Sequence, residues 1–160
     1  MNEIRVKVAD AAVGQGDAIL STVGLGSCVA IALLDAQAGV GALAHVLLPS
    51  ATMARDQSNP AKFPSTAVPH MLKAMRALGA RESRVTAKIA GGASMFTNLL
   101  SNGGLQMGER NILATREALS RAGIPLIAQD VGGGHGRSIL FHVADGTLEV
   151  RSIVHGNMKL

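Results

Sequence analysis

Two adjoining runs of apolar residues constrain the fold of this chain more than any other feature of its sequence. The first run covers residues 28–34 and the second covers residues 41–48, with the segment from Asp35 to Gly39 before the second. Apolar runs bounded by turn residues predict strands, and so short a connection predicts that the two strands pair as an antiparallel hairpin. Pro49 sets the end of the second strand, since proline has no N–H to donate to a ladder.

Further strand patterns occur on both sides of this hairpin. Residues 4–8 alternate apolar and charged side chains, which is the period of a half-exposed strand. The other predicted strands cover residues 18–23, 84–90, 124–131, 137–144 and 147–154. Asp145-Gly146, between the last two, is a strong signal for a hairpin turn.

Two helices are predicted between these strands. The first follows Ser65 as its N-cap and ends at Gly79. Its apolar residues, which recur at helical spacing, are Val68, Met71, Leu72, Met75 and Leu78. The second runs from about Glu109 to Ala122 and is closed by Gly123. Its predicted buried side consists of Ile112, Leu113, Leu119 and Ala122.

Composition indicates a globular protein and narrows its function. Hydrophobic residues make up 48% of the 160 positions and charged residues 16%, so we expect residues 1–160 to form one domain. The three Phe, without any Trp or Tyr, offer no stacking platform for single-stranded nucleic acid. The net charge of +4 comes from scattered residues, so we expect no nucleic-acid partner. The charge fits an acidic protein partner and an ordinary solvated surface equally well.

The sequence predicts a cytoplasmic protein without membrane insertion. Charged residues interrupt the first ten positions, where a signal peptide would have an apolar segment. The longest apolar stretches, residues 29–34 and 39–48, are much shorter than the roughly 20 residues of a membrane helix. The single cysteine excludes an internal disulfide, which fits a reducing compartment and leaves Cys28 as a free thiol.

Cys28 follows a glycine-rich segment that favours nucleophilic chemistry. Gly24 and Gly26 allow the backbone to turn its amides toward the sulfur, so Gly26 and Ser27 belong to a candidate oxyanion loop. The amide of Ser27 or that of Cys28 could supply the hydrogen bond. If the hairpin turn is centred between residues 36 and 37, Cys28 lies directly opposite His45 on the same face, with β-carbons about 4.5–5.5 Å apart. A slip of one residue would put the two on opposite faces.

Other interpretations of these residues stand beside this one. Cys28 and His45 also fit an ordinary buried cysteine and a strand histidine. The glycines at 24 and 26 lack the third glycine and the following helix of a dinucleotide site, and residues 132–136 lack the Lys of a P-loop. His135, His142, His155 and Asp130 lack the spacing of metal ligands. We therefore expect no cofactor and no metal.

A resemblance to a known family favours the catalytic interpretation. The residues that carry it are Thr22 to Ala30, Ala44 to Pro49, Gly91 to Ala93, Gly108 to Asn111, Asp130 to Gly133, and Gly136-Arg137. Together they resemble the CheD family of chemoreceptor glutamine deamidases, over nearly the whole chain. The resemblance implies a layered α/β/β sandwich with mostly antiparallel sheets and two main helices. It also implies a cysteine amidohydrolase with Cys28 as nucleophile, His45 as base and Thr22 orienting His45, although Thr22 alone would be an ordinary strand residue.

The resemblance also implies partners. The substrates would be glutamines on the cytoplasmic helices of methyl-accepting chemoreceptors, and the same acyl chemistry could hydrolyse a glutamate methyl ester. The alternative is a regulatory binding partner of a CheC-type phosphatase with little catalysis of its own. A protein interface on this chain would have few aromatic residues to use, and Phe63 and Phe96 are the candidates.

Overall fold

The computed structural model describes residues 2–94 and 106–160, and it folds them into two five-stranded sheets and two long helices. The outer sheet contains, in spatial order, β1 (Glu3–Arg5), β3 (Ile19–Leu25), β8 (Arg137–His142), β9 (Leu148–Ser152) and β10 (Gly156–Lys159). The middle sheet contains β2 (Ala11–Gln15), β5 (Val40–Val46), β4 (Val29–Asp35), β6 (Thr86–Gly91) and β7 (Leu126–Val131).

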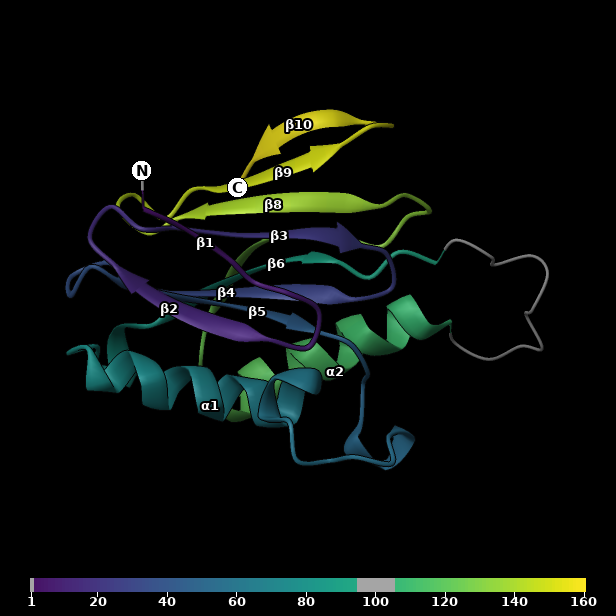
Figure 1. Cartoon of the computed structure of the whole chain (residues 1–160), viewed down its shortest axis with the longest axis horizontal. Coiled ribbons are helices and arrows are strands. Elements are labelled where there is room, and N and C mark those ends of the chain that lie inside the picture. The colour runs from purple at the N-terminus through teal and green to yellow at the C-terminus, as the bar shows by residue number, and fades with distance from the viewer. Residues whose placement is uncertain (1, 95–105) are drawn as a thin grey trace.

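The two sheets and the helices form three layers (Figure 1). The helices α1 (Pro64–Ala77) and α2 (Met107–Arg121) cover one face of the middle sheet, and the outer sheet covers its other face. Neighbouring strands are antiparallel except for the pairs β1–β3 and β6–β7. Short 3₁₀ helices occur at Ala51–Met53, Pro60–Lys62 and Glu82–Arg84. The expected α/β/β sandwich is confirmed. Neither of the two long helices is long and apolar enough to cross a membrane.

The position of β4 between the two outer layers explains why residues 29–34 are apolar without interruption. Val29, Ile31 and Leu33 face the helices, whereas Ala30 and Ala32 face the outer sheet. A strand buried on both faces needs apolar side chains at every position. The alanines leave room for the large side chains of the outer sheet, such as Phe141. Cys28 belongs to the core between the two sheets.

The β4–β5 hairpin has a different register from the predicted one. His45 lies opposite Ala30, and the last pair before the turn is Asp35 with Val40. The turn therefore has four residues, 36–39. It is stabilised by the Asp35 carboxylate, which accepts the N–H of Ala38, and by Gly39, which adopts a φ of +66°. The register differs by two residues, so Cys28 and His45 remain on the same face.

Several predicted boundaries are also corrected. α1 begins at Pro64 with Phe63 as its N-cap, so Ser65 lies inside the helix and does not cap it. Proline suits the first helical position because an N–H there would have no partner within the helix. Leu113 is half exposed, whereas Ile112 and Leu119 are buried as predicted. The strands β2 and β10 lie outside all the predicted strands.

Candidate active site

A hydrogen bond between the two sheets holds the His45 ring. His45 lies on β5 and Thr22 on β3, and both are completely buried. The Thr22 hydroxyl lies 2.7 Å from Nδ1 of His45 and 2.6 Å from the carbonyl oxygen of Val6. After Thr22, an irregularity in the pairing of β3 with β8 accommodates Gly24, which has a φ of +73°. Thr22 therefore connects His45 to the outer sheet.

These contacts define the tautomer of His45. A carbonyl oxygen can only accept, so the single hydroxyl proton of Thr22 is donated to Val6. The Thr22 oxygen must then accept a hydrogen bond, and Nδ1–H of His45 donates it. Neutral His45 consequently carries its proton on Nδ1 and has a lone pair on Nε2. Within residues 2–94 and 106–160, buried Nε2 has no hydrogen-bond partner.

Cys28 lies directly before β4, and only 8% of it is exposed. Two hydrogen bonds of 2.8 Å hold its loop against the segment that follows β6, from Gly92 N–H to the Cys28 carbonyl and from Ala93 N–H to the Gly26 carbonyl. A Cβ at Gly91 would lie 2.3 Å from the Cys28 carbonyl oxygen, and Gly91 has a φ of +112°. Glycine is therefore required where the two segments meet.

The hydrogen bonds of this loop limit which amides remain for a ligand. The N–H of Gly26 donates to the carbonyl of Gly24 at 3.1 Å. Among the described residues, neither Ser27 N–H nor Cys28 N–H donates to another backbone carbonyl. Of the predicted loop residues, Ser27 rather than Gly26 has an N–H that an incoming oxygen could use, together with Cys28.

Cys28 and His45 face the same space between the sheets. Ala30 is the partner of His45 in the ladder, so Cys28 is its diagonal neighbour, at about 7–8 Å between backbones and within reach of a ring. No hydrogen bond joins the two side chains among those of the described residues. Burial raises the pKa of the Cys28 thiol, an effect that its own backbone N–H opposes in part, and burial lowers the pKa of His45. At neutral pH the pair consists of a neutral thiol and a neutral imidazole.

Comparison with known proteins identifies the family of this chain. The family model described as CheD chemotactic sensory transduction matches residues 47–152. A protein of Caldanaerobacter subterraneus named probable chemoreceptor glutamine deamidase CheD is 44% identical over 153 residues, which cover 96% of this chain and 94% of the relative. The chain belongs to the CheD family. A Pyrococcus abyssi protein with the same name is 43% identical over 156 residues, covering 98% of this chain and 95% of its own.

The fold also resembles a solved structure outside the CheD family. A DUF152 protein from Neisseria meningitidis aligns with a TM-score of 0.51 at 11% identity, over 84% of this chain and 63% of the other. At this identity the likeness shows the fold alone. The family model matches from residue 47 onward, so Thr22, Cys28 and His45 precede its matched range.

One buried polar residue near Cys28, Asn111, belongs to the motif that carries the family resemblance, but no role is predicted for it from the sequence. Asn111 on α2 is completely buried, and its Nδ2 donates to the carbonyl of Ser27 at 2.8 Å and to the carbonyl of Leu47 at 3.2 Å. The signal was available, because Asn111 and Thr115 occupy the helical stripe that otherwise holds Ile112 and Leu119. A polar residue on an apolar stripe indicates a specific partner.

The glycine-rich loop at residues 132–136 packs against the segment that follows β6 and holds the Cys28 loop. Gly132 N–H donates to the carbonyl of Gly91, and Ser94 N–H donates to that of Gly133. Buried Arg137 forms an ion pair with Asp130 at 2.9 Å and donates to the Gly132 carbonyl. These bonds make the loop a structural turn that contacts the segment holding Cys28.

The four residues weighed as metal ligands lie in different surroundings. The rings of His135 and His155 contact each other edge to face at 4.2 Å, whereas His142 bonds to Glu149. Asp130 is occupied by Arg137. Among the described residues, no three His, Cys, Asp or Glu side chains are grouped as a metal site would require.

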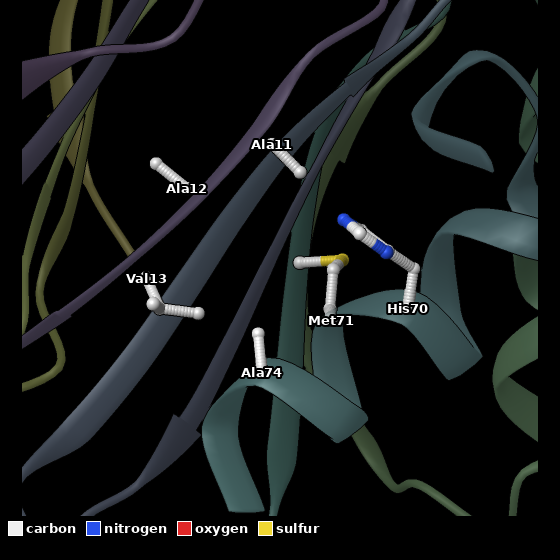
Figure 2. Close-up of a pocket in the computed structure, with 6 residues that line it drawn as sticks. All are labelled: Ala11, Ala12, Val13, His70, Met71 and Ala74. Atoms are coloured by element: carbon white, nitrogen blue, oxygen red, sulfur yellow. The ribbon is translucent and has the colours of Figure 1, made fainter. Parts of the chain in front are cut away.

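A small hollow of about 150 Å³ lies between β2 and α1, away from this site. Figure 2 shows its lining, in which His70 is the one ring among small and apolar side chains. Met71 and Val13 pack into the core on the helix side of the middle sheet. The hollow is therefore separated from Cys28 and His45, which face the outer sheet.

Proposed function

We propose that this protein deamidates glutamine side chains of chemoreceptors through a thioester on Cys28. The relatives named above carry the name of this activity. The observation that best supports the proposal is the buried His45 ring, whose Nδ1–H is bonded to Thr22 while Nε2 lacks a partner among the described residues. A base in the correct tautomer beside a thiol is the arrangement that cysteine hydrolases need.

The first half of the reaction forms the thioester. The Cys28 sulfur attacks the amide carbon of the glutamine, and its proton moves to Nε2 of His45. The carbonyl oxygen becomes an oxyanion, which accepts hydrogen bonds from the amides of Ser27 and Cys28. His45 then gives its proton to the departing nitrogen, the carbon–nitrogen bond breaks, and ammonia leaves. Because the resting pair is neutral, proton transfer accompanies the attack of sulfur.

The second half restores the enzyme. A water molecule gives a proton to Nε2 of His45 and attacks the thioester, and the same amides hold the second oxyanion. The carbon–sulfur bond breaks, His45 returns the proton to the sulfur, and glutamate is released. A glutamate methyl ester would enter the same cycle with methanol as its leaving group. The proposed substrates are cytoplasmic receptor helices, so the reaction would take place in the cytoplasm.

The alternative is a binding partner of a CheC-type phosphatase with little catalysis. Leaving a buried nitrogen without a partner costs about 1–3 kcal/mol, which an adaptor has no chemical reason to retain. The aromatic residues also give little support to a strong interface. Phe63 is completely buried, which corrects the expectation that it could serve at a surface, and Phe96 lies outside the described residues. We therefore favour catalysis.

Mass spectrometry of receptor fragments tests the proposal. The protein is incubated with the cytoplasmic fragment of a chemoreceptor, and each glutamine that becomes glutamate is mapped. Hydroxylamine is added in a parallel reaction, because it attacks a thioester and converts the same glutamine to a hydroxamate. Conversion by the wild-type protein, with hydroxamate at the same positions, is expected.

The matched control is Cys28→Ala, which should yield neither product while still binding the fragment. Conversion by Cys28→Ala would contradict the thioester mechanism. A wild-type protein that binds a CheC-type phosphatase tightly but converts no receptor glutamine would favour the regulatory alternative.

A further inference from the structure

Asn111 contacts the backbone next to Cys28 and the backbone that follows β5, the strand of His45. Its side-chain NH₂ group donates to Ser27, directly before Cys28, and to Leu47, two residues after His45. Both acceptors are carbonyl oxygens, so the amide of Asn111 can be oriented in one way only. Its Oδ1 then points elsewhere and has no partner among the described residues. The orientation that gives the Asn111 side chain two hydrogen bonds to carbonyl oxygens therefore leaves its own buried Oδ1 without a partner among the described residues.

The bond to Ser27 also orients the amide of Cys28. Ser27 carbonyl and Cys28 N–H belong to one peptide unit, and the described residues contain no cis peptide bond. In a trans peptide these two groups point in opposite directions. Because the carbonyl is held toward α2 by Asn111, the N–H is held away from α2. Without Asn111, this peptide could rotate and turn its carbonyl into the space meant for an oxyanion.

α2 is close enough to act as a rigid support for this contact. A Cβ at Gly108 would lie 2.3 Å from the carbonyl oxygen of Ala93 and 2.4 Å from that of Gly92. Those two residues bond in turn to Cys28 and Gly26. The start of α2 therefore packs directly against the segment that holds the Cys28 loop, and Asn111 extends from the next turn.

We propose that Asn111 is a positioning residue, which fixes the Ser27–Cys28 peptide so that the Cys28 amide faces the oxyanion of the reaction. This inference rests on the proposed function, since the oxyanion belongs to that mechanism. Asn111 does not contact the substrate and acts through the backbone. Loss of the positioning should slow the chemical steps and leave receptor binding unchanged.

Two substitutions on α2 test this role. Asn111→Leu removes both donors and keeps the number of side-chain heavy atoms. Thr115→Val, one turn further along the same helix, removes a buried hydroxyl that has no partner among the described residues. We expect Asn111→Leu to lower kcat about 10- to 100-fold with KM within about twofold. Thr115→Val should keep both values. The rate of Cys28 alkylation by iodoacetamide, which forms no oxyanion, should be unchanged in both variants.

Parallel losses of kcat and alkylation rate in Asn111→Leu would show a merely structural role, and an unchanged kcat would also overturn the proposal. If Asn111→Leu fails to fold, Asn111→Ser is measured instead, because serine is too short to reach both carbonyls. If the wild-type protein converts no glutamine, the proposed function fails by itself. The NMR resonance of the Cys28 amide then tests the role of Asn111. The proposed role requires that this resonance shift in Asn111→Leu and stay in place in Thr115→Val.

Discussion

The two ends of β4 bury polar groups in opposite ways. At one end, Asp35 is completely buried, and its carboxylate accepts hydrogen bonds from the backbone of Ala38 and Arg81 and from the Arg84 guanidinium. At the other end, His45 of the neighbouring strand is also completely buried, and Cys28 is almost so. Nε2 of His45, however, has no partner in the part of the chain that the structure describes.

This difference separates structural polar groups from candidate chemical ones. Burial alone would raise the pKa of the Asp35 carboxyl, but the hydrogen bonds from Arg84, Arg81 and Ala38 lower it to about 2. Asp35 thereby ties the hairpin turn to the segment before β6. Burial lowers the pKa of His45 without such compensation. The hydrogen-bonded carboxylate of Asp35 stabilises the fold, whereas Nε2 of His45, without a partner among the described residues, is available to the proposed reaction.

The largest effect is expected from removing the sulfur. Cys28→Ala should lower deamidation at least about a thousandfold, since no other group can form the thioester. The free energy of unfolding should change by less than about 1.5 kcal/mol, because the substitution removes a single small atom group from the core. Receptor conversion and urea denaturation check the two parts. Activity retained by a folded Cys28→Ala protein would show that the unsaturated end of β4 is not the reactive one.

At Asp35, the end of β4 whose buried carboxylate is fully hydrogen-bonded, a substitution is expected to change stability and to leave the reactivity of Cys28 unchanged. Asp35→Asn should lower the free energy of unfolding by about 3 kcal/mol, because it leaves Arg84 without its buried partner. The alkylation rate of Cys28 should stay within twofold of the wild-type rate. The matched control is Glu117→Gln, which breaks the exposed pair with Arg121 and should cost less than about 0.5 kcal/mol. Equal losses in both variants would refute a special role of burial at Asp35.

The local elements were predictable because their signals are local. Helical stripes identified α1 and α2, and continuous apolar runs identified β4 and β5. β2 and β10 carry no alternating apolar pattern, and they become strands only by pairing with β5 and β9. β2 pairs with a segment distant in the sequence, whereas β10 forms a hairpin with the neighbouring β9, and in both strands the pairing leaves no signal in the strand's own residue pattern.

The site was predictable as a set of residues but not as an arrangement. Sequence motifs named Thr22, Cys28 and His45, whereas the contact between Thr22 and His45 joins two sheets. The hairpin register depended on one carboxylate–amide bond at residue 35 and one left-handed glycine. Asn111 acquires its meaning only because α2 packs beneath the Cys28 loop.

A smaller effect is expected at the residue that orients His45. Thr22→Val has nearly the same shape but loses the hydroxyl that accepts Nδ1–H, so kcat should fall about 10- to 100-fold. Thr22→Ser keeps the hydroxyl and should retain most of the activity. Binding of the receptor fragment should be alike in all three proteins. Equal kcat values for Thr22→Val and Thr22→Ser would make Thr22 a plain strand residue.

The smallest expected effect is a difference between the two ends of β4 in their response to pH. The folded chain resists protonation of His45, so the pKa of His45 lies below the ordinary 6.5. The unfolded state then binds the extra proton, and stability falls as the pH drops below about 6.5. The pKa of Asp35 is about 2 in the folded state against 3.8 ordinarily, so its contribution is complete above pH 4 and disappears as the pH falls through 2.

Denaturation of the wild-type protein and of Asp35→Asn at a series of pH values separates these windows. The stability difference between the two proteins should be constant from pH 7 to about 4 and shrink only below that. The acid limb of kcat/KM, which reports the base of the free enzyme, should lie below pH 6.5 in both proteins. An acid limb above pH 6.5 would mean that His45 is not held neutral by burial, and that the unsaturated end of β4 is open to solvent when the reaction begins.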